Sequence, residues 1–290
     1  MKWRFGGSVP SVAEWVLRER FPTDEGEMAW DRLGAGPPVV LVHGTPWSSW
    51  TWRRAAPCLA ERFSVYVFDL LGFGASEKRP GQDVSLAAHG ARLAALLEHW
   101  ALDRPAVIAH DIGGATTLRA HLLHERPVSA LALIDVVALR PWGSPFYRLV
   151  REHTAVFEQL PAAIHQGVLR AYVRTAHPRT LDRAVEDVLI APWLGVDGQS
   201  AFYRQIAHGD QRHTDEIEPL YGRITAPTLV IWGEADPWLP VAHGVELARR
   251  IPSARLEVLR SAGHLVQEDR PDELLRLLRE HLGLAKYLTQ

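Results

Sequence analysis

The chain has little of several features that would place it in a special class. Cys58 is the only cysteine among 290 residues, so neither an intrachain disulfide nor a thiolate metal cluster can form. No hydrophobic run reaches the length of a membrane span, and the first residues lack the apolar segment of a signal peptide. The formal net charge is only -2, which gives no general attraction to nucleic acid or to a membrane surface. We therefore expect a cytoplasmic monomer or homodimer whose partner is a small-molecule substrate.

Internal repeats, glycine-serine linkers and low-complexity segments are also missing from the sequence. Hydrophobic residues make up 47% of the chain and charged residues 23%, which is ordinary for a globular protein and sufficient for a sizeable core. A chain of 290 residues is long for one domain, but α/β folds of this size often form one core with an inserted subdomain.

Short apolar runs alternate with helical patterns along most of the chain. The runs are 38–42, 65–68, 106–109, 131–134, 228–231 and 256–259, and the helical patterns are at about 50–61, 85–100, 113–124, 241–250 and 272–281. Uninterrupted apolar runs are typical of strands buried on both faces, as in a parallel sheet. Alternation of such strands with helices predicts a wound α/β sheet with its site at the carboxyl ends of the strands.

The alternation stops between about residues 139 and 221, where helical patterns are interrupted by prolines. We interpret 139–221 as a helical cap inserted after the sixth strand. The core would then consist of 1–138 and 222–290, and the absence of a flexible tether predicts that the cap packs on it.

The most informative motif is Ala109-His110-Asp111-Ile112-Gly113, which directly follows an apolar run. Small residues at both ends of such a segment allow a sharp turn from strand to helix that exposes the central side chain in a cleft. The usual motif has serine at that position, whereas this chain has Asp111. A carboxylate with a reference pKa near ~3.9 is already charged at neutral pH. It can displace a leaving group from saturated carbon and form an ester that water must later cleave.

Two further residues complete a catalytic set in the chain order nucleophile, acid, histidine. His264 follows the run 256–259, and its imidazole would activate water. Asp236 follows the run 228–231 and could hold that imidazole in one tautomer. Asp135, at the end of the run 131–134, is a second candidate for the orienting role.

The turn His43-Gly44-Thr45-Pro46 follows the first of the parallel strands. The backbone N–H of Thr45 could point into the cleft together with that of Ile112, and two such donors form an oxyanion hole. They would stabilise the tetrahedral intermediate that forms on the carboxyl carbon of Asp111 when water attacks the ester. His43 would brace the turn by hydrogen bonding.

These motifs together resemble a known group, the aspartate-nucleophile α/β-hydrolases, which includes epoxide hydrolases, haloalkane dehalogenases and fluoroacetate dehalogenases. The resemblance rests on 43–46, on 69–76 with the sequence DLLGFGAS, on the Asp111 elbow and on Gly263-His264. It implies an α/β-hydrolase fold with a mainly parallel eight-stranded sheet and a helical cap. The stretch 43–53 is most similar to haloalkane dehalogenases.

Two departures from the group bear on the reaction. Haloalkane dehalogenases usually carry tryptophan after the nucleophile and often asparagine or glutamate at the third position of the HGxP turn, where this chain has Ile112 and Thr45. Fluoroacetate dehalogenases carry an arginine after the nucleophile. In the cap, Phe202-Tyr203-Arg204 resembles the segment from which epoxide hydrolases supply a tyrosine to the epoxide oxygen. Tyr203 is the leading candidate for that acid.

Other aromatic residues are candidates for binding the substrate. Epoxide hydrolases commonly use a second tyrosine, which could be Tyr147 or Tyr172. Trp142, Trp193 and Trp238 could line an apolar pocket or donate an indole N–H to a halide, and they could equally pack the core or the lid.

The sequence thus predicts a cofactor-free hydrolase without a metal that opens a carbon-heteroatom bond through an ester on Asp111, with an epoxide as the preferred substrate class. Dehalogenation of an alkyl halide is the alternative. A lyase, a cyclase or a ligand-binding protein on the same fold is an alternative of another class.

Overall fold

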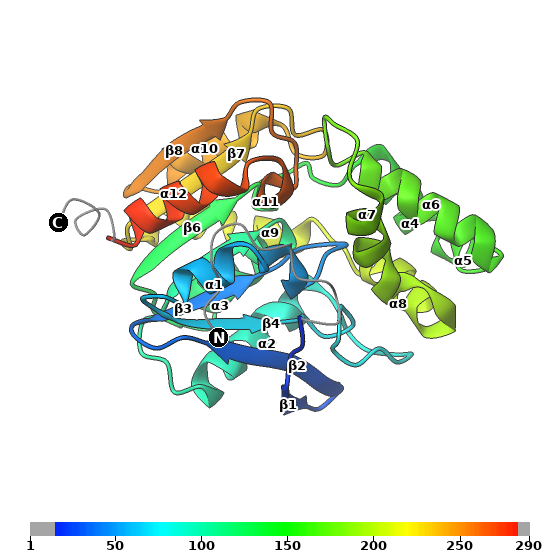
Figure 1. Cartoon of the computed structure of the whole chain (residues 1–290), viewed down its shortest axis with the longest axis horizontal. Helices are drawn as coiled ribbons and strands as arrows, with labels where there is room; N and C mark the ends of the chain where they lie inside the picture. The colour runs from blue at the N-terminus through cyan, green and yellow to red at the C-terminus, as the bar shows by residue number, and fades with distance from the viewer. Residues whose placement is uncertain (1–14, 284–290) are drawn as a thin grey trace.

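The computed structural model describes residues 15–283, which contain one eight-stranded sheet of order β1-β2-β4-β3-β5-β6-β7-β8 (Figure 1). The strands are β1 Glu19–Thr23, β2 Gly26–Leu33, β3 Pro38–Val42, β4 Ser64–Phe68, β5 Ala106–His110, β6 Ala130–Ile134, β7 Thr228–Gly233 and β8 Ala254–Leu259. Strands β3 to β8 are parallel, whereas β2 is antiparallel to both β1 and β4. The expected mainly parallel eight-stranded sheet is therefore confirmed.

All six apolar runs form the parallel strands, and the β1–β2 hairpin supplies the other two. The hairpin lies at the sheet edge, where β1 is mostly exposed. A strand that is solvated on one side alternates polar with apolar residues and has no continuous apolar run. For this reason, the apolar runs of the sequence do not include the hairpin.

Helices cover both faces of the sheet. Along each parallel strand, alternate residues belong to two separate hydrophobic clusters, because successive side chains point to opposite faces. One cluster joins the sheet to α2 Leu86–His99, α3 Ile112–Leu122 and α10 Val241–Arg250. The other joins it to α1 Ala55–Leu59 and α12 Pro271–His281, beside which lies α11 Val266–Asp269.

The helical pattern expected at about 50–61 forms two short pieces instead of one helix. A 3-10 turn, η1, covers Ser49–Trp52 and is capped by the Ser48 hydroxyl, and α1 follows. Pro57 is the third residue of α1. Proline has no backbone N–H and is tolerated only in the first turn of a helix, so α1 cannot extend back to residue 50.

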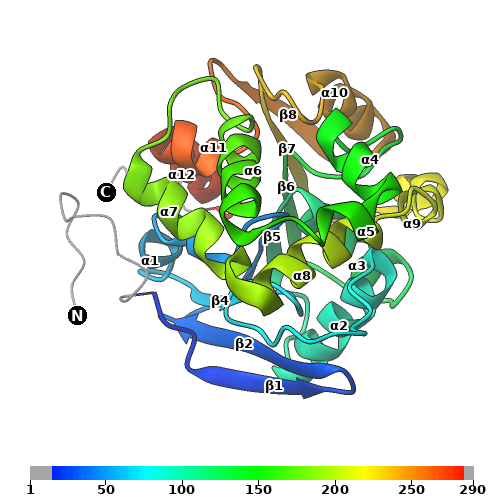
Figure 2. The ribbon, with the colours of Figure 1, turned by 90° about the vertical axis from the view of Figure 1, so that its right-hand side faces the viewer.

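The segment between β6 and β7 is helical and lies across one end of the sheet, over the carboxyl ends of the parallel strands (Figures 1 and 2). It contains α4 Pro145–Glu152, α5 Thr154–Phe157, α6 Ala162–Arg174, α7 Arg183–Ile190, η2 Ala191–Trp193, α8 Gly195–Ala207, α9 Arg212–Asp215 and η3 Glu218–Arg223. We use the name cap for α4 to α8. The cap shares buried residues with the core cluster, among them Trp193 and Phe202.

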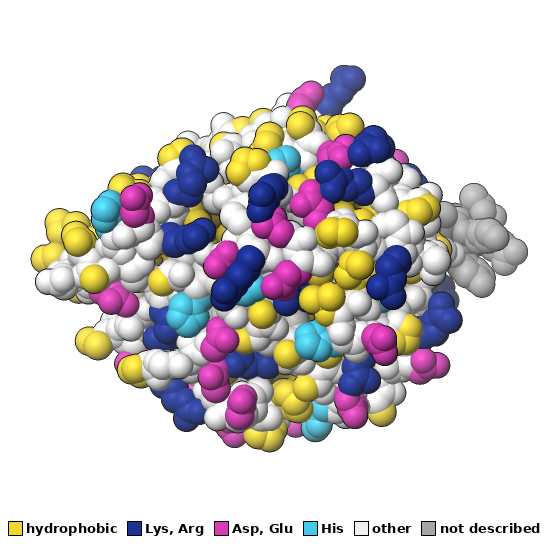
Figure 3. Space-filling view, turned by 180° about the vertical axis from the view of Figure 1, so that it is seen from behind, with side chains coloured by type: hydrophobic (Ala, Val, Ile, Leu, Met, Phe, Trp, Pro, Cys, Tyr) yellow, Lys and Arg dark blue, Asp and Glu magenta, His cyan; other side chains and the backbone are white. Residues whose placement is uncertain are grey.

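The surface carries charges of both signs. Figure 3 shows Lys and Arg side chains interspersed with Asp and Glu on the face seen from behind. Within residues 15–283, none of the helices has both the length and the apolar character needed to cross a membrane.

Candidate active site

Asp111 occupies a strained turn between β5 and α3. Its backbone has φ 52° and ψ -125°, a conformation that is uncommon for a residue other than glycine. Glycines at two neighbouring positions make this turn possible, because a side chain at either would collide with the chain around Asp111. A Cβ at Gly113 would lie 2.6 Å from the carbonyl oxygen of His43, and a Cβ at Gly44 would lie 2.3 Å from Cβ of Asp111. Strain of this kind is held by tertiary packing and is common at functional sites.

The imidazole of His264 lies between two carboxylates. Its Nδ1 is 2.8 Å from Oδ2 of Asp236, and its Nε2 is 3.3 Å from Oδ2 of Asp111. Burial acts to lower the pKa of His264, but the charge of Asp236, its hydrogen bond to Nδ1 and the nearby carboxylate of Asp111 outweigh it and hold this pKa well above its usual value. Burial likewise acts to raise the pKa of Asp111, and His264 more than compensates, so this pKa lies below its usual value. Both shifts favour the charged pair, an imidazolium beside an ionised Asp111.

Backbone N–H groups hold the second oxygen of Asp111. Thr45 donates its N–H to Oδ1 over 2.6 Å, and the N–H of Ile112 is a further hydrogen-bond partner of this carboxylate. His43 braces the turn, because its Nδ1 donates to the carbonyl oxygen of Gly44 and its Nε2 accepts the N–H of Leu70, each over 2.9 Å. Oδ1 thus lies where an oxyanion would form, and Oδ2 faces His264.

Asp135 is close to this group but does not contact the imidazole in the way Asp236 does. Its Oδ1 accepts the backbone N–H of Gly233 over 2.7 Å. Asp236 carries the hydrogen bond to Nδ1 of His264, so of the two acids it is Asp236 that has the geometry of the orienting residue.

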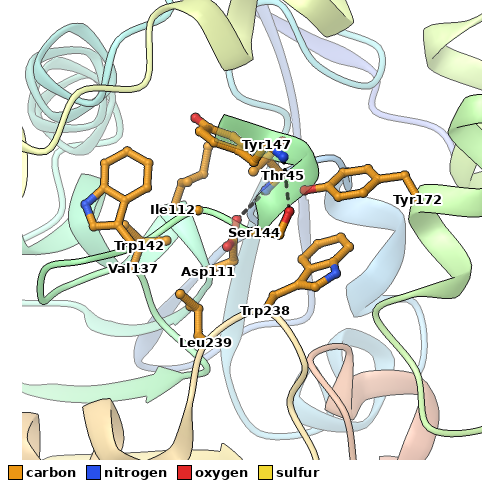
Figure 4. Close-up of a pocket in the computed structure, with 11 residues that line it drawn as sticks. Thr45, Asp111, Ile112, Val137, Trp142, Ser144, Tyr147, Tyr172, Trp238 and Leu239 are labelled. Carbon is orange, nitrogen blue, oxygen red and sulfur yellow. Dashed lines mark hydrogen bonds between the residues drawn. The ribbon is translucent and has the colours of Figure 1, made fainter. Parts of the chain in front are cut away.

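A small pocket opens above Asp111 (Figure 4). It is lined by Thr45, Asp111, Ile112, Val137, Trp142, Gly143, Ser144, Tyr147, Tyr172, Trp238 and Leu239. Asp111 is the only charged side chain among these lining residues. Such a site suits a small neutral molecule, because a ligand with its own charge would find no charged partner in the pocket other than Asp111.

Two cap tyrosines line the pocket with different orientations (Figure 4). The hydroxyl of Tyr172 is directed toward Ser144 and the space above Asp111, whereas the hydroxyl of Tyr147 points away. A Cβ on Gly209 would lie 2.0 Å from the Tyr147 hydroxyl oxygen, so that oxygen lies against the backbone of residue 209. Burial and the charge of Asp111 raise the pKa of both phenols. Both are therefore fully protonated at neutral pH.

Tyr203, the leading candidate from the sequence, does not line this pocket. It is fully buried, and its hydroxyl lies 2.9 Å from Nδ1 of His165. Nε2 of His165 lies 2.9 Å from the carbonyl oxygen of Trp193. Nε2 must therefore carry the proton, and Nδ1 accepts the hydrogen bond that Tyr203 donates. The phenol is engaged within the cap.

The three tryptophans also differ in their placement. Trp142 and Trp238 line the pocket, but their indole N–H groups donate to the hydroxyls of Thr214 and Thr175 over 3.0 and 2.9 Å. Trp193 lies outside the pocket lining. Its indole N–H donates to the carbonyl oxygen of Pro46 over 2.7 Å.

The cap contacts the turn 43–46 directly. Besides the bond from Trp193 to Pro46, the hydroxyl of Thr45 donates to Oε1 of Gln205 over 2.9 Å. Trp193 and Gln205 come from η2 and α8, so the cap holds two adjacent residues of the turn whose N–H binds Asp111. We call this pair of hydrogen bonds the cap clamp.

A family model of the alpha/beta hydrolase fold matches residues 37–271. The chain belongs to this family. An alpha/beta hydrolase fold protein from Burkholderia ambifaria has a structure similar to this α/β-hydrolase, with a TM-score of 0.89, 45% sequence identity, and coverage of 92% of this chain and 98% of that one.

Other relatives of this α/β-hydrolase have different names. Haloalkane dehalogenase 2 from Mycobacterium tuberculosis is 26% identical over 276 residues, which cover 91% of this chain and 94% of the relative. A thermophilic esterase from Thermogutta terrifontis is 26% identical with a TM-score of 0.73, covering 92% of this chain and 98% of that one. Relatives of this kind define the hydrolase family without defining the reaction.

Sequence reasoning did not single out Ser144, Gln205 or His165. No local motif marks them, because each acts through a contact with a residue far along the chain, as Gln205 does with Thr45. It also could not choose between Tyr147 and Tyr172. Only the direction in which each side chain enters the pocket separates them.

Proposed function

We propose that this α/β-hydrolase opens small neutral epoxides through an ester on Asp111, with Tyr172 as the proton donor. The observation that supports this best is the pairing of an ionised carboxylate with a protonated phenol across one pocket. Asp111 and Tyr172 both line it, and the phenol is directed toward the space above the carboxylate. An epoxide needs both groups, a nucleophile for its carbon and an acid for its oxygen.

In the first step Oδ2 of Asp111 attacks an epoxide carbon. The C–O bond breaks, its electron pair stays on the ring oxygen, and that oxygen takes the proton of Tyr172. Oδ1 keeps its hydrogen bond from Thr45 throughout. The product of this step is a hydroxyalkyl ester of Asp111 and a phenolate, which must recover a proton before the next turnover. Proton donation by a positioned side chain contributes typically about 10² to 10⁴ in rate.

In the second step His264 activates water. Esterification removes the negative charge of Asp111, which is one of the groups that raise the pKa of His264. The imidazolium therefore loses its proton more readily once the ester has formed, and Nε2 becomes a base. Water attacks the carboxyl carbon of Asp111, and the N–H groups of Thr45 and Ile112 stabilise the oxyanion on Oδ1. Collapse releases the diol and leaves one oxygen from water on Asp111.

The pocket favours an epoxide over an alkyl halide. A departing halide needs N–H donors that are free to bind it, and the two pocket tryptophans donate elsewhere, to Thr214 and Thr175. Ile112 stands directly after the nucleophile and has no side-chain donor. Dehalogenation stays the second candidate because a relative at 26% identity is named haloalkane dehalogenase 2.

A His264→Phe variant tests the covalent step. Incubated with a small terminal epoxide, it should accumulate an adduct equal to the mass of the intact epoxide. With a bromoalkane, an adduct of the alkyl group alone together with bromide release would favour the second candidate. A single turnover of the wild type in H₂¹⁸O should place the label on Asp111 and not on the diol. Label in the diol after one turnover would rule out the ester mechanism.

A further inference from the structure

Asp135 is a buried carboxyl group for which the mechanism above has no use. It lies at the end of β6, between the strand that leads to Asp111 and the strand that leads to Asp236. Its side chain is fully buried, and its backbone has φ 43°. Oδ1 accepts the N–H of Gly233, whereas Oδ2 accepts no hydrogen bond from any residue within 15–283. A buried carboxylate oxygen without a donor is costly.

Asp236, in contrast to Asp135, has hydrogen-bond partners on both of its oxygens. Oδ1 of Asp236 accepts the N–H groups of Trp238 and Leu239 over 2.7 and 3.0 Å, and its Oδ2 bonds to His264. Both oxygens of Asp236 therefore have the hydrogen-bond partners that an ionised carboxylate needs. Asp135, in contrast, has one donor for two oxygens.

The net charge of the site also distinguishes Asp135 from the other carboxyl groups. Asp111 and Asp236 contact the imidazole of His264, and Asp135 is a third buried carboxyl group whose pKa responds to the charges of both Asp236 and His264. The other nearby imidazole, His110, is neutral, because burial and the charge of His264 lower its pKa to about 3. Three ionised carboxylates would leave two uncompensated negative charges in a buried cluster. Neighbouring buried carboxyls avoid this when one of them keeps its proton.

We propose that Asp135 is a neutral carboxylic acid at neutral pH, that its Oδ2–H donates to the carboxylate of Asp236, and that it thereby acts as a positioning residue for His264. The hydrogen bond supplies the partner that Oδ2 lacks and disperses part of the charge that Asp236 presents to the imidazole. Burial, the charge of Asp236 and a hydrogen bond shared with Asp236 raise the pKa of Asp135 well above its usual value, which agrees with the unpartnered Oδ2. The kinetic part of this inference rests on the proposed function, whereas the protonation state does not.

Infrared spectroscopy tests the protonation state without any substrate. The carbonyl stretch of a carboxylic acid is separate from the bands of carboxylates, and ¹³C labelling of aspartate identifies it. The wild type should show an acid band at pH 7 that persists at pH 8, and Asp135→Asn should lack it. Identical carboxylic-acid regions in the two proteins would mean that Asp135 is ionised, and the inference would be overturned.

Kinetics on an epoxide test the positioning role. Asparagine keeps an acceptor for Gly233 and a donor for Asp236, so Asp135→Asn should keep kcat within about threefold of wild type. Asp135→Leu removes the donor, so Asp236 presents its full charge to His264. In the wild type, kcat should rise with pH as His264 loses its proton. In Asp135→Leu, the midpoint of this rise should lie about one pH unit higher.

The outcomes separate clearly. A more than tenfold lower kcat for Asp135→Asn would mean that a charged Asp135 is needed, which contradicts the inference. If Asp135→Leu does not fold, the infrared comparison and the asparagine variant still decide. If the wild type acts on no epoxide, the proposed function fails while the acid band can still be present.

Discussion

Replacing Tyr172 and Tyr203 separately by phenylalanine should produce opposite phenotypes. Both residues are buried cap tyrosines, and Tyr203 has the sequence context that resembles an epoxide hydrolase acid. Only Tyr172, however, lines the pocket with Asp111. The comparison therefore separates the role that the local sequence suggests from the role that the tertiary placement supports.

The expected cost of Tyr172→Phe lies in catalysis. Without the phenol, the ring oxygen of the epoxide must leave as an alkoxide with no proton donor. Turnover should therefore slow by a factor of about 10² to 10³, which corresponds to roughly 2.7 to 4 kcal/mol of barrier. Phenylalanine keeps the stacked contact with Trp238, whose ring centroid is 4.5 Å away. The variant should therefore melt close to the wild type and should bind substrate with little change in KM.

The expected cost of Tyr203→Phe lies in stability. The change leaves Nδ1 of His165 without its donor in a buried site, which costs about 1 to 3 kcal/mol. That loss should lower the melting temperature by roughly 2 to 5 °C, while kcat stays within about threefold of wild type. Tyr147→Phe is the matched control inside the pocket, because its hydroxyl points away from Asp111.

Stopped-flow or steady-state diol formation and thermal melts of the four proteins measure both quantities. Suppose that Tyr203→Phe slows turnover at least a hundredfold while Tyr172→Phe stays near wild type. That result would refute the assignment of the proton donor, and it would mean that the cap rearranges on binding so that Tyr203 reaches the substrate.

Further predictions concern Asp111, the cap clamp and His264. Gly44→Ala should reduce ester formation at least a hundredfold, since the added Cβ would lie 2.4 Å from Oδ1 of Asp111; normal adduct formation, followed by intact mass in a His264→Phe background, would contradict this. Gln205→Leu should lower kcat by about threefold to tenfold with KM nearly unchanged, because Thr45 loses its cap partner. Gln199→Leu on the same helix is the control and should leave kcat unaffected, because its amide donates to the carbonyl oxygens of Glu158 and Leu160, away from Thr45. Because the pKa of His264 is raised in the folded protein, its contribution to stability is fully present below about pH 6.5 and is lost as pH rises through the raised pKa. Thermal melts from pH 6 to 10 should therefore show the gap between wild type and His264→Gln narrowing with rising pH, and a constant gap would exclude a charged His264.

Some of this protein could be predicted from local residues alone. The six parallel strands are continuous apolar runs, because a strand buried on both faces must be apolar at every position. The elbow at Asp111 is local as well, since small residues must flank a side chain held at a positive φ. The edge hairpin was missed because its solvated face breaks the apolar run, and the split of the first helical pattern followed from Pro57 and the capping Ser48.

Tertiary structure alone decided which side chains of the cap meet Asp111. A helix presents each residue in a direction set by its packing, so Tyr172 enters the pocket while Tyr203, in a segment with a recognisable motif, turns toward His165. For the two acids, chain order already favoured Asp236, and the folded chain shows the contact itself: Asp236 bonds to the imidazole, whereas Asp135 accepts the N–H of Gly233. The local sequence determines which reactive side chains are present. The directions in which they point, and the distances between them, depend on contacts between residues far apart in the chain.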